Sequence, residues 1–290
     1  MAKNQQQKQK KLQLKAAKRK KRELEKKKKE ILRKQQDQLN DLIAYSLQLV
    51  QEKSYYEAEK LLNKALSAHP DEGYIYYAYG LLYVTSGHSD KGIIALERAI
   101  ILDHKFAPSY FNLAMAYYKS TYLHKMLDTL NQMFDQASYD EECFTLGKKL
   151  IKDTEELIKK NDNISLEDYC NNQRIFDQAF TFMSEKKYEQ AISSFSSLLA
   201  VDATHVASHG NIGICYSQLG QRDLAIEFFD KALELDPNYE LALFNKTIIE
   251  GKEESEIIGS EMQSMEYYKD FPLQNKSLFE DIKMKLSHQK

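Results

Sequence analysis

The sequence predicts an all-α fold in which helix hairpins stack into a solenoid. Only ten glycines and four prolines interrupt the 290 residues, and this scarcity of helix breakers disfavours a turn-rich β fold. Apolar residues recur at helical spacing in pairs of segments of about 14 residues each. A slot for a small residue recurs in steps of 34, 34, 65 and 34 residues, at Ala58, Gly92, Met126, Ala191 and Ala225. Because one hairpin cannot bury its apolar face alone, neighbouring hairpins are expected to stack.

The chain begins with a basic arm, residues 1–38, which we expect to be helical or disordered. It has 16 basic and four acidic side chains, a net charge of +12, whereas residues 39–290 have 25 basic and 39 acidic ones, a net charge of −14. The arm is rich in good helix formers, and as one helix it would extend about 50 Å. Its apolar residues are too few for a firm coiled coil. Its densest basic clusters comprise Lys18, Arg19, Lys20, Lys21, Arg22, Lys26, Lys27, Lys28 and Lys29.

Three binding roles are open for the arm, besides that of a solvated tail. Clustered lysines neutralise phosphates, which suits nucleic acid or ribosomal RNA, although no base-reading motif would make such binding specific. An anionic membrane surface is less well supported, because the arm has no aromatic anchors. The third role is contact with an acidic protein surface, including the acidic remainder of this chain. The run Lys18–Arg22 also fits a nuclear localisation patch.

Five units of 34 residues follow the arm, three in 39–140 and two in 172–239. In the third unit Met126 replaces the small residue. The last unit, 206–239, shows the full pattern through His209, Ile212, Gly213, Tyr216, Gly220, Ala225, Phe229, Ala232 and Pro237. This period and these residues resemble the tetratricopeptide repeat. The resemblance implies a right-handed superhelix with a concave groove. It also implies a noncatalytic scaffold or adaptor for protein–protein interaction, with a chaperone-like protein as one form of it.

Residues 141–171 are expected to form an irregular helical connector between the two blocks of repeats. Residues 141–160 have the periodicity of one long helix, which ends at the sequence Asn161-Asp162-Asn163. Ser165 with Asp168 resembles a capping box at the start of the next helix. Two interpretations stay open for the connector, a hinge and a degenerate sixth repeat that packs continuously with its neighbours.

Residues 240–290 are expected to form capping helices and a tail. The segment Tyr239–Glu250 continues the helical periodicity with the polar face of a cap. Leu278, Ile282 and Leu286 lie four residues apart and predict an amphipathic helix. We expect this helix to cover the last repeat, and binding of a partner is the alternative.

The resemblance also implies candidate residues for binding a partner. Tetratricopeptide repeats often hold a bound peptide's backbone with an asparagine, because its amide both donates and accepts hydrogen bonds. Asn112, Asn211 and Asn245 match that slot. The clamp that grips the C-terminal carboxylate of heat-shock chaperones is absent, so this partner class is not expected. Spacing predicts an apolar face in the first block, unless its tyrosines pack on neighbouring helices, made of Tyr74, Tyr77, Leu81, Phe111, Met115 and Tyr118.

The sequence contains no catalytic constellation. There is no phosphate-binding loop, since Gly210 and Gly213 lie in a first helix where small residues serve packing. His205 and His209 have the i, i+4 spacing of metal ligands, but His209 fills a packing slot and no HExxH motif surrounds the pair. The cysteines form no CxxC pair, being Cys143, Cys170 and Cys215. We therefore expect neither an enzyme nor a bound cofactor or metal.

The leading hypothesis is a cytoplasmic scaffold or adaptor whose groove binds a peptide or helix of a partner protein. No apolar run reaches the roughly 18 residues of a membrane span, and the charged N-terminus is unlike a secretory signal. Sparse cysteines suit a reducing compartment. The alternative hypothesis is a nucleic-acid- or ribosome-associated factor that binds through its basic arm. A repeat fold predicts how binding occurs and leaves the partner's identity open.

Overall fold

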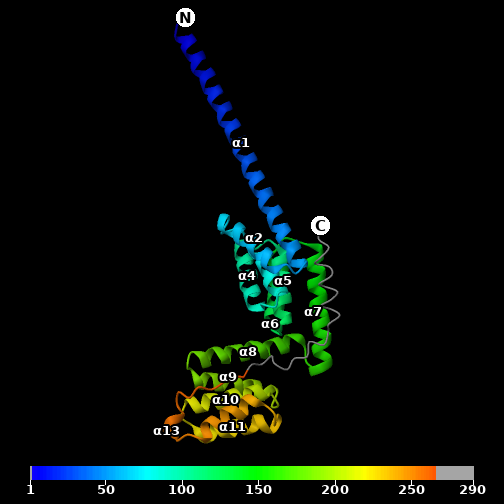
Figure 1. Cartoon of the computed structure of the whole chain (residues 1–290), viewed down its shortest axis with the longest axis vertical. Coiled ribbons are helices and arrows are strands. Elements are labelled where there is room, and N and C mark those ends of the chain that lie inside the picture. The colour runs from blue at the N-terminus through cyan, green and yellow to red at the C-terminus, as the bar shows by residue number, and fades with distance from the viewer. Residues whose placement is uncertain (1, 266–290) are drawn as a thin grey trace. The chain divides into compact units, whose positions relative to one another are not determined.

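The structure is a computed structural model that describes residues 2–265, where it contains helices and turns but no strand (Figure 1). The all-α prediction is confirmed. The chain forms two compact units, Met1–His104 and Lys105–Lys290. The first unit contains α1 (Ala2–Gln51), α2 (Tyr55–Ala68), α3 (Gly73–Thr85) and α4 (Ser89–Leu102). The second contains α5 (Ala107–Lys119), α6 (Leu123–Gln136), α7 (Glu141–Asp162), α8 (Leu166–Ser184), α9 (Tyr188–Val201), α10 (Val206–Gln218), α11 (Arg222–Leu235), α12 (Glu240–Glu250) and α13 (Glu254–Ile257).

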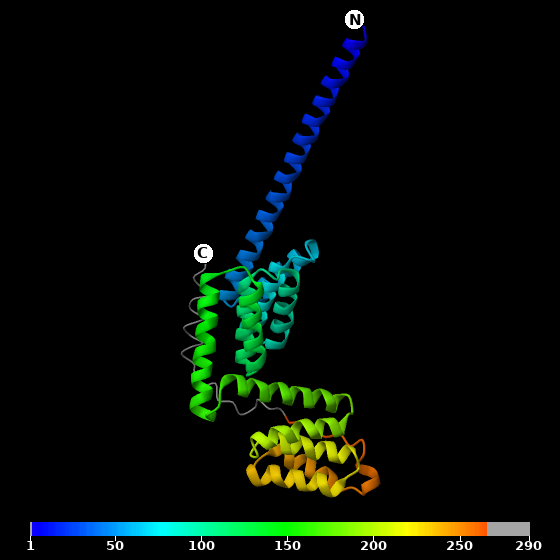
Figure 2. The ribbon, with the colours of Figure 1, turned by 180° about the vertical axis from the view of Figure 1, so that it is seen from behind.

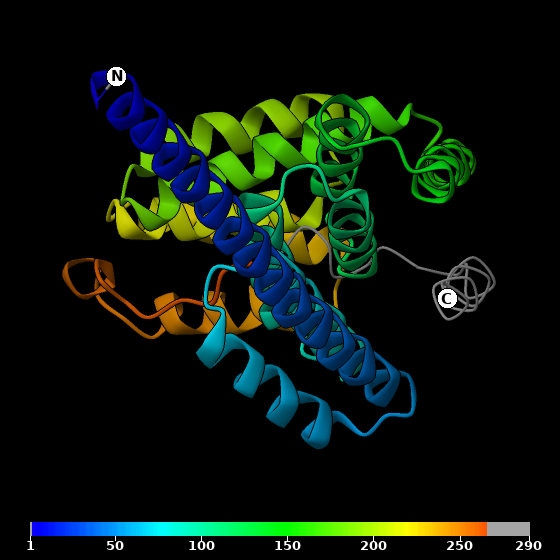
Figure 3. The same cartoon turned by 90° about the horizontal axis from the view of Figure 1, so that it is seen from above.

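Helix α1 carries the basic arm into the first repeat without a break (Figure 3). Every side chain from 18 to 38 is exposed, whereas Leu39 is only 4% exposed. Beyond this residue α1 joins the core of the first unit through Ile43 and Val50. Burial along the described part of α1 therefore begins at the residue where the sequence predicts the first repeat.

The paired helices of the first unit approach each other at a small residue, as the repeat pattern predicts. Gly92 of α4 faces Val84 of α3, and a Cβ atom at Gly92 would lie 2.5 Å from the Val84 Cγ2 atom. A polar contact joins the two hairpins, because the Tyr79 hydroxyl of α3 donates to Asn63 Oδ1 of α2 at 2.6 Å. Packing within and between hairpins thus builds one continuous core.

In the second unit the long helix of the connector ends, and the next helix starts, at the residues that the sequence predicts (Figure 2). Helix α7 ends at Asp162, and Asn163 caps it in the left-handed conformation with φ 56°. Helix α8 begins after Ser165, whose Oγ atom accepts a hydrogen bond from the Asp168 N–H at 3.0 Å. An asparagine after the helix and a serine before the next one satisfy backbone groups that a helix end leaves unpaired.

Helix α6 contacts α8 directly, although α7 separates them in the sequence. The buried Gln173 side chain of α8 accepts from the His124 N–H at 3.0 Å and donates to the Thr121 carbonyl at 3.0 Å. Arg174 of α8 pairs with Asp128 of α6 at 2.7 Å. A hinge motion at residues 141–171 would have to break these bonds.

In the second unit α10 and α11 pack closely against each other, and α12 follows them. A Cβ atom at Gly213 of α10 would lie 2.8 Å from the Phe229 Cε1 atom of α11. Between the two helices Gly220 adopts φ +74°, a conformation that costs glycine little. Helix α12 (Glu240–Glu250) lies where the sequence predicts a helix, and its capping role stays a prediction. The helix predicted around Leu278, Ile282 and Leu286 lies outside the described residues.

We predict that Gly213→Leu destabilises the protein by about 2 kcal/mol or more, because its side chain would overpack the contact with Phe229. Urea unfolding followed by circular dichroism measures the change. Gly251→Leu is the matched control, since the nearest atom to a Cβ there is the Thr247 carbonyl oxygen at 3.7 Å, and we expect a change within about 0.5 kcal/mol. Equal losses for the two variants would contradict the close approach of α10 and α11.

Candidate functional site

Residues 259–265, which we call the strap, follow α13 and lie along α10 and α12 without regular secondary structure. In Figure 1 this segment is drawn in orange between α13 and the grey trace. Hydrogen bonds join its backbone to the side-chain amides of Asn211, Gln218 and Asn245. The residues at one end of the strap meet the C-terminal end of α10 and those at the other end meet its N-terminal part. The strap therefore runs antiparallel to α10.

Each of the two asparagines binds both backbone groups of one strap residue. Asn211 donates from Nδ2 to the Met265 carbonyl at 2.8 Å and accepts at Oδ1 from the Met265 N–H at 2.9 Å. Asn245 makes the same pair of bonds with Gln263, at 2.7 and 2.9 Å. In an extended chain the N–H and C=O groups of alternate residues point to the same edge. The two asparagines therefore read one edge of an extended peptide.

Gln218 extends this set to the start of the strap. Its Nε2 atom donates to the Ser260 carbonyl at 3.0 Å, and its Oε1 atom accepts from the Gly259 N–H at 3.2 Å. It lies seven residues after Asn211, two helical turns along the same face of α10. Asn211 and Asn245 are both fully buried, so unpaired amides there would be costly. The strap supplies the partners that these buried amides need.

Two methionines are the side chains by which the strap contacts the repeats. Met265 is fully buried and lies over Gly210, where an added Cβ atom would clash with its thioether sulfur. The Ser217 hydroxyl of α10 donates to the Met262 sulfur at 3.0 Å. Glu261, Gln263 and Ser264 are exposed. The site thus combines backbone recognition with two apolar anchors three residues apart.

The other asparagine predicted to bind a partner has a different environment. Asn112 is buried in α5, and its Nδ2 atom donates to the Pro108 carbonyl of the same helix at 2.8 Å. Phe111, Met115 and Tyr118 of α5 are also buried. In the first unit Tyr74, Tyr77 and the partly buried Leu81 all lie on α3. The rings of Tyr74 and Tyr77 are stacked, with their centroids 5.6 Å apart. A partner-binding role for these residues stays a prediction.

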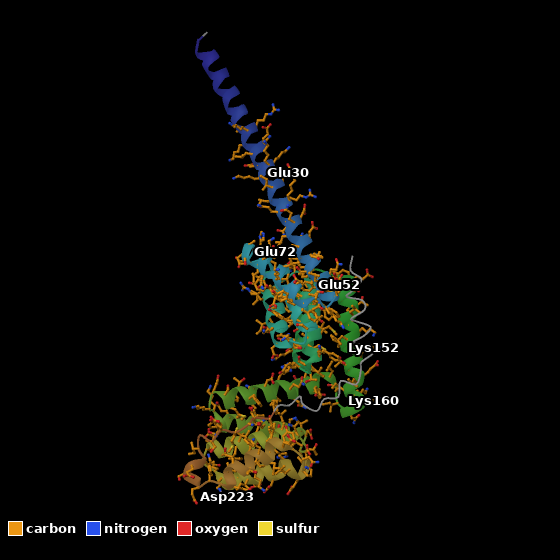
Figure 4. All side chains as sticks on the ribbon, in the orientation of Figure 1. Glu30, Glu52, Glu72, Lys152, Lys160 and Asp223 are labelled. Carbon is orange, nitrogen blue, oxygen red and sulfur yellow. The ribbon has the colours of Figure 1, made fainter. Side chains whose placement is uncertain are left out.

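The basic residues predicted for electrostatic contact are all exposed on α1, as Figure 4 shows around Glu30. Successive residues of an α-helix point about 100° apart. The runs Lys18–Arg22 and Lys26–Lys29 therefore present positive charge around the whole circumference and not as one stripe.

The histidines considered for chemistry bond to neighbouring groups of the chain, and the three cysteines are free and buried. His205 caps α10, since its Nδ1 atom accepts from the Ser208 N–H at 3.1 Å, and the His209 Nε2 atom lies 2.9 Å from the Ala203 carbonyl oxygen. Burial raises the pKa values of Cys170 and Cys215 to about 12, and that of Cys143 is also raised. Among the residues that the structure describes, no group of three acidic, histidine or cysteine side chains is arranged to hold a metal ion. None of the described helices combines the length and apolar character needed to cross a membrane.

Two stretches match the sequence profile of the tetratricopeptide repeat, residues 73–104 and residues 206–239. They correspond to α3–α4 in the first unit and α10–α11 in the second. The chain contains tetratricopeptide repeats. Such repeats generally mediate protein–protein interaction and are generally noncatalytic. The Asn211 slot lies in one of the two matched repeats.

The chain is also similar to known proteins over part of its length. The uncharacterized protein ycf37 of Guillardia theta is 37% identical over 75 residues, which are 24% of this chain and 42% of that protein. The chain thus matches less than half the length of this relative.

Similar solved structures include YrrB, a TPR protein with an unusual peptide-binding site, at 19% identity and a TM-score of 0.36, covering 71% of this chain and 90% of that one. They also include the TPR2AB domain of yeast Sti1 in its pHSP90 complex, at 16% identity and a TM-score of 0.39, covering 74% and 83% of the two chains. The TPR domain of P58(IPK) is 16% identical with a TM-score of 0.38, covering 73% and 64%.

We predict a pH dependence of stability that comes from the cap of α10. Burial lowers the pKa of His205 to about 4, from an ordinary value of 6.5. Between these values the unfolded chain binds the proton more readily, so stability present above pH 6.5 is lost as the pH falls towards 4. His205→Asn keeps a capping acceptor and removes the titration. We expect the wild type to lose about 2 kcal/mol more than this variant between pH 7 and pH 5, measured by urea unfolding. Parallel pH profiles would contradict the burial of a neutral His205.

Proposed function

We propose that the protein is a noncatalytic interaction module that captures an extended segment of a partner protein on the face where the strap lies. We call this face, formed by Gly210, Asn211, Ser217, Gln218 and Asn245, the strap site. The observation that carries the proposal is the pairing of Asn211, Gln218 and Asn245 with the backbone of residues 259–265. Three cysteines that are all free and buried fit a reducing compartment such as the cytoplasm.

The chemistry of the strap site suits recognition of a peptide in an extended conformation. The amides bind main-chain groups, which every peptide presents, so they provide affinity with little dependence on sequence. The side chains that contact Gly210 and Ser217 are apolar. The strap site would therefore select peptides that carry apolar side chains at these two positions. No residue of the strap site as defined is ionisable, so we assign no acid, base or nucleophile to it.

A second candidate function uses the basic arm. Its support is that residues 18–38 are exposed along a helix that carries two runs of lysine and arginine. A rod with positive charge on all sides suits the phosphates of a nucleic acid, and binding of this kind weakens steeply as salt is added. The repeats would then recruit proteins to the bound nucleic acid.

The peptide-binding function is tested by selecting peptides from a displayed library on the full chain carrying Met262→Ser and Met265→Ser, which weakens the hold of the strap. We expect selected peptides to lose at least about tenfold in affinity when Asn211→Ala and Asn245→Ala are added, because each amide makes two hydrogen bonds. Asn238→Ala is the matched control, since Asn238 is exposed between α11 and α12. Peptides that bind all of these variants equally would contradict the proposed site.

The arm is tested by measuring the affinity of the full chain for single-stranded RNA over a series of salt concentrations. Changing Lys26–Lys29 to glutamine should weaken binding and make the salt dependence shallower by up to about three units of slope. A variant with Lys148, Lys149, Lys159 and Lys160 changed to glutamine removes four charges from α7 and serves as the control. Equal slopes for the arm variant and the wild type would rule out the arm as the RNA-binding element.

A further inference from the structure

We propose that the strap is an internal ligand of the strap site, and that a partner segment must present two long apolar side chains three residues apart to replace it. This inference rests on the function proposed above and names the ligand class of the same site. It explains why an extended segment outside the repeat pattern lies on the face that the repeat asparagines line. The contacts that carry it are those of Asn211 with Met265, 54 residues apart in the chain.

The strap contacts the repeats as a bound peptide would. Its backbone groups pair with side-chain amides at Gly259, Ser260, Gln263 and Met265. Between its two anchors the side chains of Gln263 and Ser264 remain exposed. Nothing in this arrangement depends on the covalent link to α13, so a separate segment with the same pattern can make the same contacts.

The anchor for Met265 exists because one repeat lacks a large side chain. The slot just before the asparagine slot holds a large apolar residue in every other unit and in the cap, namely Ile43, Tyr77, Phe111, Phe176 and Phe244. In the unit 206–239 the same slot holds Gly210. Met265 lies over this glycine, with its sulfur in the space that a side chain would fill. An unbranched and flexible thioether suits such an irregular gap, so Gly210 is the specificity-determining residue.

A tethered ligand weakens the binding of any free one. A short linker holds the strap at an effective concentration on the order of millimolar. A partner segment of equal intrinsic affinity, present at micromolar concentration, would occupy the site in roughly one molecule in a thousand. The strap therefore sets a threshold that weak or mismatched segments do not pass.

The first test measures the affinity of the chain for a synthetic copy of its own strap. The probe is a fluorescein-labelled peptide of residues 257–265 with an amidated C-terminus, and the readout is fluorescence anisotropy. Full-length protein with Met262→Ser and Met265→Ser should bind the probe at least about tenfold more tightly than the wild type, because its own strap competes less well. Gln263→Ala with Ser264→Ala is the matched control, since both side chains are exposed, and it should bind as weakly as the wild type. No gain over this control overturns the proposal.

The second test fills the space over Gly210 in the protein whose strap carries the two serine substitutions. Gly210→Leu restores a large apolar residue of the kind that the other units carry, and thermal unfolding verifies that it folds. With the strap weakened by the two serine substitutions, a probe with glycine in place of Met265 should bind at least about tenfold more weakly than the native probe. With Gly210→Leu added, the two probes should bind equally. A preference for methionine that survives Gly210→Leu overturns the role of Gly210.

The outcomes separate this inference from the proposed function. If the probe binds no variant while selected peptides still depend on Asn211, the internal-ligand proposal fails and peptide binding stands. If no peptide depends on Asn211, the proposed function fails as well. Sedimentation of the wild type should show a monomer. A dimer that dissociates when the two methionines are changed would place the strap in a second copy and overturn the internal assignment.

Discussion

A side-chain amide inside a protein must have partners for both its N–H and its C=O groups, and this constraint shapes the C-terminal half of the chain. Asn211 and Asn245 are fully buried and lie 34 residues apart, at the same slot of successive helical units. Neither helix supplies partners for both amide groups, because the N–H groups within a helix are already bonded and cannot donate to the side-chain oxygen. The backbone of the strap supplies them, and it does so in the extended conformation that spaces Gln263 and Met265 correctly.

The rest of the site follows from this pairing and from how the hairpins pack. Gly213 allows α11 to lie close to α10, and Gly210, one turn earlier in α10, leaves room for Met265. The repeat pattern fixes the first of these glycines, because small residues serve the contact between paired helices. The second glycine, Gly210, departs from the pattern. This departure gives the repeat the space by which it selects a ligand.

Much of the fold could be predicted from the sequence because it arises from local periodicity. The start of the repeats at Leu39, the end of α7 at Asn163 and the cap at Ser165 all depend on neighbouring residues. The asparagine slots could also be predicted, since position within the repeat determines which face a residue occupies. Gln218 was missed, although its spacing of seven from Asn211 is a signal that could have identified it.

The strap could not be predicted, because it has no helical period and its partners lie 18 to 54 residues away. Amide hydrogen exchange of the Gln263 and Met265 N–H groups in the full chain tests the account most directly. If Asn245 and Asn211 hold them, both amides should exchange at least about a hundredfold more slowly than in an unstructured peptide of the same sequence, and Asn211→Ala should release Met265. Exchange of both amides at the peptide rate in the wild type would contradict the account.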